Sequence, residues 1–123
     1  MAASGHSQIF MKNLAKRSVY LNLTTSKWSS LRGIMKVLLA SDHAGYALKE
    51  KLLKSDLAEW VDMGPDSDAR VDYPDFAHKA CKALLAGKAD YAVMICGSGQ
   101  GMAMAANKHK GIRAALCWSE EIA

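Results

Sequence analysis

Cysteine, proline and long apolar runs are all scarce in this sequence, and each shortage excludes a class of protein. Only three cysteines occur among the 123 residues, none of them in a C-x-x-C pair, so neither a disulfide framework nor a zinc cluster is expected. No apolar run approaches eighteen residues, which excludes a transmembrane helix. Half of the residues are hydrophobic and two are prolines, so the composition indicates one folded domain in a reducing, cytoplasmic setting.

Acidic residues are absent from the first 34 positions, which carry five Lys and Arg. Apolar Phe10 and Leu14 could share one face of a helix between Ile9 and Val19, opposite Lys12, Lys16 and Arg17. This pattern is typical of an organellar transit peptide, and a disordered tail or a stretch ahead of a start at Met35 are the alternatives. We therefore expect residues 1–34 to lie outside the fold. Residues 35–123 carry eleven basic and twelve acidic residues, which does not indicate a nucleic-acid surface.

From Met35 onward, strand and helix patterns alternate. We expect strands at 35–40, 60–63, 91–95 and 112–117, and helices from Tyr46, from Pro74 to 85, and over 102–108. In the first helix, Leu48, Leu52 and Leu53 are predicted on the apolar side, and Lys49, Glu50 and Lys54 on the polar side. The alternation predicts an α/β fold, a parallel sheet with helices on both faces.

Two segments follow strands with unusual composition, Ser41–Gly45 and Cys96–Gly101. Ligands bind beyond the carboxyl ends of the strands in such sheets. Three glycines in the second segment let backbone N–H groups converge near a helix N-terminus, which can hold a phosphate or an oxyanion. The same setting would lower the pKa of the Cys96 thiol and favour the thiolate.

Other interpretations of these residues remain open at this point. Cys96 could be an inert core residue, Asp42 a helix N-cap and His43 a surface residue. The G-x-G-x-G loop is close to a dinucleotide fingerprint, for which Glu120 could serve as the ribose-binding acid. However, Met102 stands where that fingerprint needs Gly or Ala.

Three stretches, SDHAGYALKE, VDYPDFA and ICGSGQGMAMAANKHKGIRAALC, resemble the ribose-5-phosphate isomerase B family, which includes galactose-6-phosphate and allose-6-phosphate isomerases. The similarity runs in order from Met35 to the last residue. It implies a three-layer, Rossmann-like domain that interconverts ribose 5-phosphate and ribulose 5-phosphate, in the pentose phosphate pathway, through an enediolate. It also implies a homodimer or homotetramer without cofactor, metal, membrane or nucleic-acid partner.

The resemblance also assigns roles to single residues. Cys96 matches the base that removes the substrate C2 proton, and Met102 stands where other relatives have a catalytic glutamate. Ser98 would lend a hydroxyl, and Asp42, His43 and Tyr73 would contact the substrate. The substrate-binding loop would comprise Gly97, Gly99, Gln100 and Gly101. Asn107 and Arg113 match family positions for which we expect structural roles.

Relatives continue beyond the point that matches Ala123, through a further strand, a helix and a ring-opening histidine. From this departure we expect a domain, 35–123, that lacks the family's last strand and helix, with little or no activity by itself. A catalytically silent homologue is the corresponding alternative. The stretch ahead of Trp60 is also a few residues shorter than in relatives.

Overall fold

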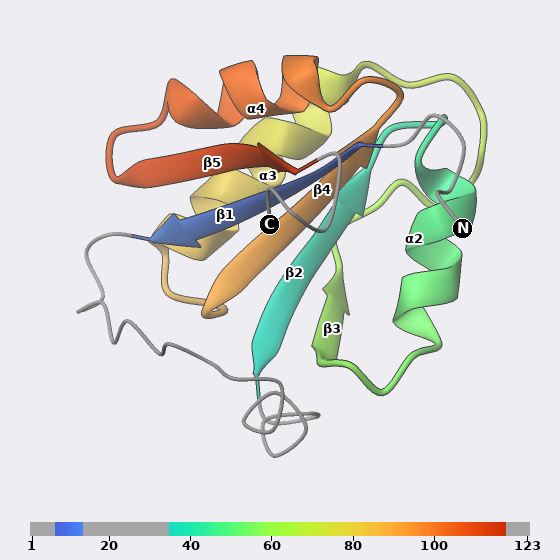
Figure 1. Ribbon diagram of the computed structural model, residues 1–123, viewed down its shortest axis with the longest axis horizontal. Coiled ribbons are helices and arrows are strands. Elements are labelled where there is room, and N and C mark those ends of the chain that lie inside the picture. Colours follow the sequence, from blue (N-terminus) through green and yellow to red (C-terminus); the bar gives the residue numbers. More distant parts are fainter. Residues whose placement is uncertain (1–6, 14–34, 118–123) are drawn as a thin grey trace.

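The computed structural model describes residues 7–13 and 35–117, which form one five-stranded sheet and three helices (Figure 1). The strands are β1 (Ser7–Asn13), β2 (Lys36–Ser41), β3 (Glu59–Asp62), β4 (Tyr91–Cys96) and β5 (Ile112–Cys117). The helices are α2 (Tyr46–Leu53), α3 (Tyr73–Leu85) and α4 (Gln100–Asn107). In space the strands follow the order β3-β2-β4-β1-β5.

The elements predicted from residue 35 onward are all present. β2 pairs in parallel with β3 on one side and with β4 on the other, as the alternation of strands and helices predicts. Pro74 stands in the first turn of α3, where its missing N–H costs no hydrogen bond. The described helices include none that is long and apolar enough to cross a membrane.

The N-terminal segment overturns part of the sequence prediction. Residues 7–13 were expected outside the fold, and 9–19 as an amphipathic helix, yet Ser7–Asn13 forms β1 within the sheet. β1 runs antiparallel to both of its neighbours, with Ile9 opposite Met94 of β4 and Leu116 of β5. The sheet is therefore mixed, with β5 running in the direction of β4. The rest of the transit-like segment, 14–34, lies outside the described residues.

The strand Ser7–Asn13 was not predicted because it depends on contacts with strands far along the chain. The chain leaves β4, passes through α4 and returns as β5, but β5 does not pair with β4. A position for one strand, called the slot here, lies between them, and β1 fills it. A segment of seven residues with an apolar middle can fill this position through backbone hydrogen bonds. Residue periodicity within the segment does not reveal the slot.

The helices cover both faces of the sheet, and the main core lies under α3 and α4. Alternate strand residues Leu38, Ala40, Ala92 and Met94 join one buried cluster with Ala77, Ala80, Cys81, Leu84, Met102 and Ala106 of the helices. The intervening residues Val37, Leu39 and Ile95 are buried on the opposite face, where α2 packs across β2, β3 and β4. Figure 1 shows α2 separated from the α3–α4 pair by the sheet.

Candidate active site

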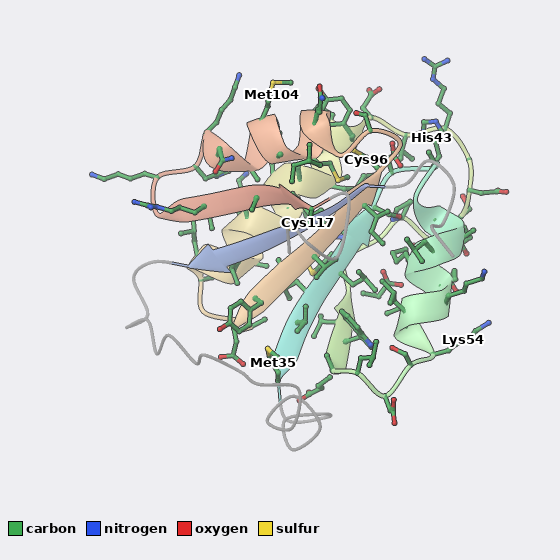
Figure 2. The ribbon with its side chains drawn as sticks, in the orientation of Figure 1. Met35, His43, Lys54, Cys96, Met104 and Cys117 are labelled. Atoms are coloured by element: carbon green, nitrogen blue, oxygen red, sulfur yellow. The ribbon has the colours of Figure 1, made fainter. Side chains whose placement is uncertain are left out.

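The two segments singled out by composition meet at the carboxyl edge of β2 and β4. These strands are hydrogen-bonded neighbours, with Ser41 opposite Ile95. The pairing extends by one residue, because the Asp42 N–H donates to the Ile95 carbonyl at 3.0 Å. Asp42 therefore stands beside Cys96, and Figure 2 shows His43 and Cys96 at this same edge of the sheet.

Asp42 is buried and shapes the turn into α2. Its Oδ1 accepts a hydrogen bond from the Gly45 N–H at 2.8 Å, which satisfies a free donor at the start of the helix. Gly45 packs directly on β4, since a Cβ at this position would lie 2.6 Å from the Ile95 carbonyl oxygen. The sequence analysis missed this role of Gly45, for which the glycine in SDHAG was the available signal.

His43 is exposed and reaches toward the segment that follows β3. Its Nδ1 accepts a hydrogen bond from the Val71 N–H at 3.4 Å. An imidazole that accepts at Nδ1 carries its neutral-state proton on Nε2, so Nε2 is a hydrogen-bond donor. His43 can thus offer an N–H at the carboxyl edge of the sheet.

Cys96 ends β4 with its thiol under the glycine loop. The Gly99 N–H donates to Cys96 Sγ at 3.0 Å, and the residue is only 4% exposed. Gly99 has φ of 76°, a left-handed conformation that favours glycine and that turns its amide toward the sulfur. A negative charge on the sulfur would strengthen this hydrogen bond.

The rest of the loop leads into α4. Ser98 is exposed, and its Oγ accepts a hydrogen bond from the Gln100 N–H at 3.3 Å. Gly97 and Gln100 are exposed as well. Tyr73, at the start of α3, lies against Gly101, because a Cβ on that glycine would come within 2.7 Å of Tyr73 Cζ. The structure thus brings Tyr73 to the loop from a different element.

A buried lysine forms an ion pair close to the Asp42 turn, and its burial contradicts the sequence prediction. Lys49 was expected on the polar side of its helix, but its side chain is 0% exposed. Its Nζ contacts Asp62 Oδ1 at 2.8 Å and Glu50 Oε1 at 3.3 Å. Helical periodicity could not find this position, because the end of β3 brings a carboxylate under α2.

The same carboxylate links α2 to the end of β2. Asp62 Oδ1 also accepts the Gly64 N–H at 2.9 Å, and the Gly64 carbonyl accepts the Ser41 N–H at 3.1 Å. These bonds connect Lys49 to the residue that precedes Asp42. The ion pair therefore helps to hold the first candidate segment in place.

Asn107 and Arg113 do not belong to the group of residues at the carboxyl edge of β2 and β4. Asn107 exchanges two hydrogen bonds with the Ala114 backbone, at 2.8 and 3.0 Å, which fits its expected structural role. Arg113 is exposed on β5. Burial raises the pKa of the Cys81 thiol to about 11, so this cysteine is neutral at physiological pH.

The geometry does not favour a dinucleotide-binding loop or a metal site at this edge of the sheet. Met102 is fully buried in the core where a dinucleotide loop needs a small residue, and Glu120 lies outside the described residues. The described ranges contain no group of three or more His, Cys, Asp or Glu side chains that could hold a metal ion.

Comparison with known proteins gives a consistent result. The model of the Ribose/Galactose Isomerase family matches residues 37–123. Ribose-5-phosphate isomerase B of Escherichia coli is 38% identical over 85 residues, which cover 67% of this chain and 57% of that protein.

Solved structures give the same family. The type B ribose 5-phosphate isomerase of Leishmania infantum matches with a TM-score of 0.60 and 45% identity, over 64% of this chain and 55% of that one. Ribose-5-phosphate isomerase B of Clostridium thermocellum matches with a TM-score of 0.59 and 42% identity, over 63% and 54%. The chain spans less than two thirds of the length of these relatives.

Proposed function

This chain belongs to the ribose/galactose isomerase family, and we propose that it isomerises a sugar phosphate between its aldose and ketose forms, with ribose 5-phosphate and ribulose 5-phosphate as the pair. The observation that carries this proposal is the position of Cys96. Its thiol lies 3.0 Å from the Gly99 nitrogen, and the residue stands beside Asp42 on the neighbouring strand. A relative that matches 67% of this chain and a solved structure that matches 64% of it are both named ribose 5-phosphate isomerases of type B.

In the proposed reaction, the Cys96 thiolate removes the proton from C2 of the open-chain aldose. An S–H bond forms, the C2–H electron pair forms the C1–C2 double bond, and the carbonyl electrons move to O1. The enediolate then takes the proton from sulfur at C1. The O2 proton moves to solvent as the carbonyl forms at C2, and O1 takes up a proton from solvent to become the C1 hydroxyl, which leaves the thiolate as it began. The steps balance without a redox cofactor.

The loop amides supply the electrostatic part of the proposed mechanism. Charge develops on O1 in the enediolate, and backbone N–H groups fixed in advance stabilise such charge at little reorganisation cost. Gly97–Gly101 carries these donors next to the first turn of α4, with the Ser98 hydroxyl at its exposed edge. The Gly99 N–H holds the sulfur in the same loop.

The proposed substrate contacts come from the neighbouring strand and helix. Asp42 Oδ1 is engaged by Gly45, so a sugar hydroxyl would bind at Oδ2. His43 would donate from Nε2, and Tyr73 would border the sugar from α3. Cys96 is largely covered, so we propose that the loop opens to admit the substrate. We also propose assembly into a homodimer or homotetramer, which sedimentation can test.

The test is proton exchange at C2. This exchange requires only that the base remove and return a proton on the open-chain sugar, so it can be measured in a chain that completes little or no turnover. The chain is incubated with ribose 5-phosphate in D₂O, and loss of the C2 proton signal is followed by NMR. Removing a general base lowers a reaction rate by about 10²- to 10⁴-fold. Cys96→Ala should therefore slow the exchange by at least about 10²-fold. Cys117→Ala is the matched control, a cysteine at the end of β5, two strands away from β4, and should exchange like the unmodified chain. Equal exchange by Cys96→Ala and the control would contradict the thiol base.

A further inference from the structure

Two histidines from different elements meet at hydrogen-bond distance, away from the candidate active site. His78 lies on α3 and His109 lies in the turn between α4 and β5. His78 Nδ1 and His109 Nε2 are 2.7 Å apart, and the ring centroids are 4.9 Å apart. Both residues are half-buried. No step of the proposed isomerisation uses either ring.

The distance between the nitrogens favours a shared proton over a shared metal ion. Two nitrogens bound to one tetrahedral zinc at about 2.0–2.1 Å would be roughly 3.3 Å apart. The observed 2.7 Å lies instead in the range of a hydrogen bond. One ring nitrogen must therefore carry a proton and the other must accept it.

We propose that His78 and His109 form a pH-sensitive latch, which holds α3 against the turn between α4 and β5 and opens when both rings are protonated. A neutral or singly protonated pair has one acceptor nitrogen and keeps the hydrogen bond. In the doubly protonated pair both facing nitrogens are donors, so the bond is lost and two cations face each other.

The surroundings of the pair resist the second proton. Burial lowers the pKa of His109, and the nearby His78 and Lys82 lower it further. The charged residues along α3 around His78, on the turn and on the adjoining end of β5 are mostly cationic: Asp75, Lys79, Lys82, Lys108, Lys110 and Arg113. The folded chain therefore takes up the second proton only below the ordinary histidine value of about 6.5.

The latch would act on elements that lead to the loop. The turn is closed by two backbone bonds, from the His109 N–H to the Ala106 carbonyl and from the Ile112 N–H to the His109 carbonyl, both 3.1 Å. It packs closely on α3, since a Cβ on Gly111 would lie 3.3 Å from Leu85 Cδ2. Tyr73, which lies against Gly101, begins that same helix. Opening the latch should loosen α3 along the α4 side.

The sign of the pH effect follows from proton binding. A histidine whose pKa is lower in the folded chain than in the unfolded chain makes the unfolded state bind more protons below pH 6.5. The stabilising effect is therefore complete above pH 6.5 and is lost as the pH falls. For one such proton, the unfolding equilibrium constant rises by up to tenfold per pH unit.

The test follows the four histidines of the full chain by NMR and its unfolding by urea, between pH 7.5 and 5. In the unmodified chain we expect the pair to take up its second proton only below the ordinary histidine value of about 6.5. His109→Gln and His78→Gln should each remove the shared hydrogen bond and reduce the pH dependence of the unfolding equilibrium constant below pH 6.5, by up to tenfold per pH unit.

Lys54→Gln is the control, an exposed residue at the end of α2 that lies outside the pair, and it should leave the pH dependence of unfolding unchanged. Independent titration of His78 and His109 near 6.5 in the unmodified chain would overturn the latch, and this measurement needs no variant to fold. Unfolding curves for His109→Gln that vary with pH like those of the unmodified chain would also overturn it. None of these readouts depends on the proposed isomerase activity.

Discussion

The ring of Tyr73 occupies the space that a side chain on Gly101 would need. A Cβ at that position would lie 2.7 Å from Cζ and 2.9 Å from Cε2 of Tyr73, closer than such contacts allow. This packing joins the first residue of α3 to the first turn of α4. It fixes the distance between two predicted site residues that are 28 positions apart in the sequence.

Substituting Gly101 by alanine should force Tyr73 or α4 to move. Overpacking of this kind costs about 1–3 kcal/mol, which urea unfolding would measure. Gly97→Ala is the matched control in the same loop, because its Cβ would meet only Ala44 Cβ, at 3.8 Å. Equal free energies of unfolding for the two variants would show that Tyr73 can move aside without destabilising the chain.

Removing Lys49 and removing Asp62 should destabilise the chain by different amounts. Lys49 is 0% exposed, whereas the Asp62 side chain is 38% exposed and can be hydrated when alone. Asp62→Asn therefore leaves a buried ammonium without its nearest counter-charge and should destabilise the chain by about 2–4 kcal/mol. Lys49→Met should cost less. Urea unfolding of both single variants and the double variant measures the asymmetry, and the opposite order would contradict it.

Deleting residues 1–13 should release β5 from the sheet. Among the described residues, the ladder partner of β5 is β1, and β4 is not paired with it directly. Amide hydrogen exchange within Ile112–Cys117 should become at least about tenfold faster. This corresponds to a decrease of about 1.4 kcal/mol in the free energy of local opening. Deletion of residues 1–6 keeps β1 and is the control. Unchanged protection in the longer deletion would mean that β4 and β5 can close the slot themselves.

Cys81 should resist alkylation near neutral pH. With its pKa raised to about 11 by burial, about one thiol in a thousand is ionised at pH 8. Iodoacetamide at pH 8 should modify the partly exposed Cys117 well before Cys81, as peptide mass spectrometry would show. The raised pKa also favours folding below about pH 9, and this contribution is lost as the pH rises toward 11. Comparable labelling of both cysteines would contradict this.

The elements from residue 35 onward, and the two segments at the carboxyl edge of the sheet, could be predicted from the amino-acid sequence alone. Local patterns suffice for these, because strand and helix periods and the glycines of the loop are properties of neighbouring residues. The three motifs that resemble the isomerase family lie in this same part, and the family match covers it.

Three features could not be predicted without the folded chain: the place of Ser7–Asn13 in the sheet, the burial of Lys49 and the contact between His78 and His109. Each depends on a partner far along the chain: a slot between two strands, a carboxylate at the end of β3, and a turn beside α3. Periodicity within a segment cannot reveal such partners, because burial and pairing are set by what the rest of the chain brings alongside.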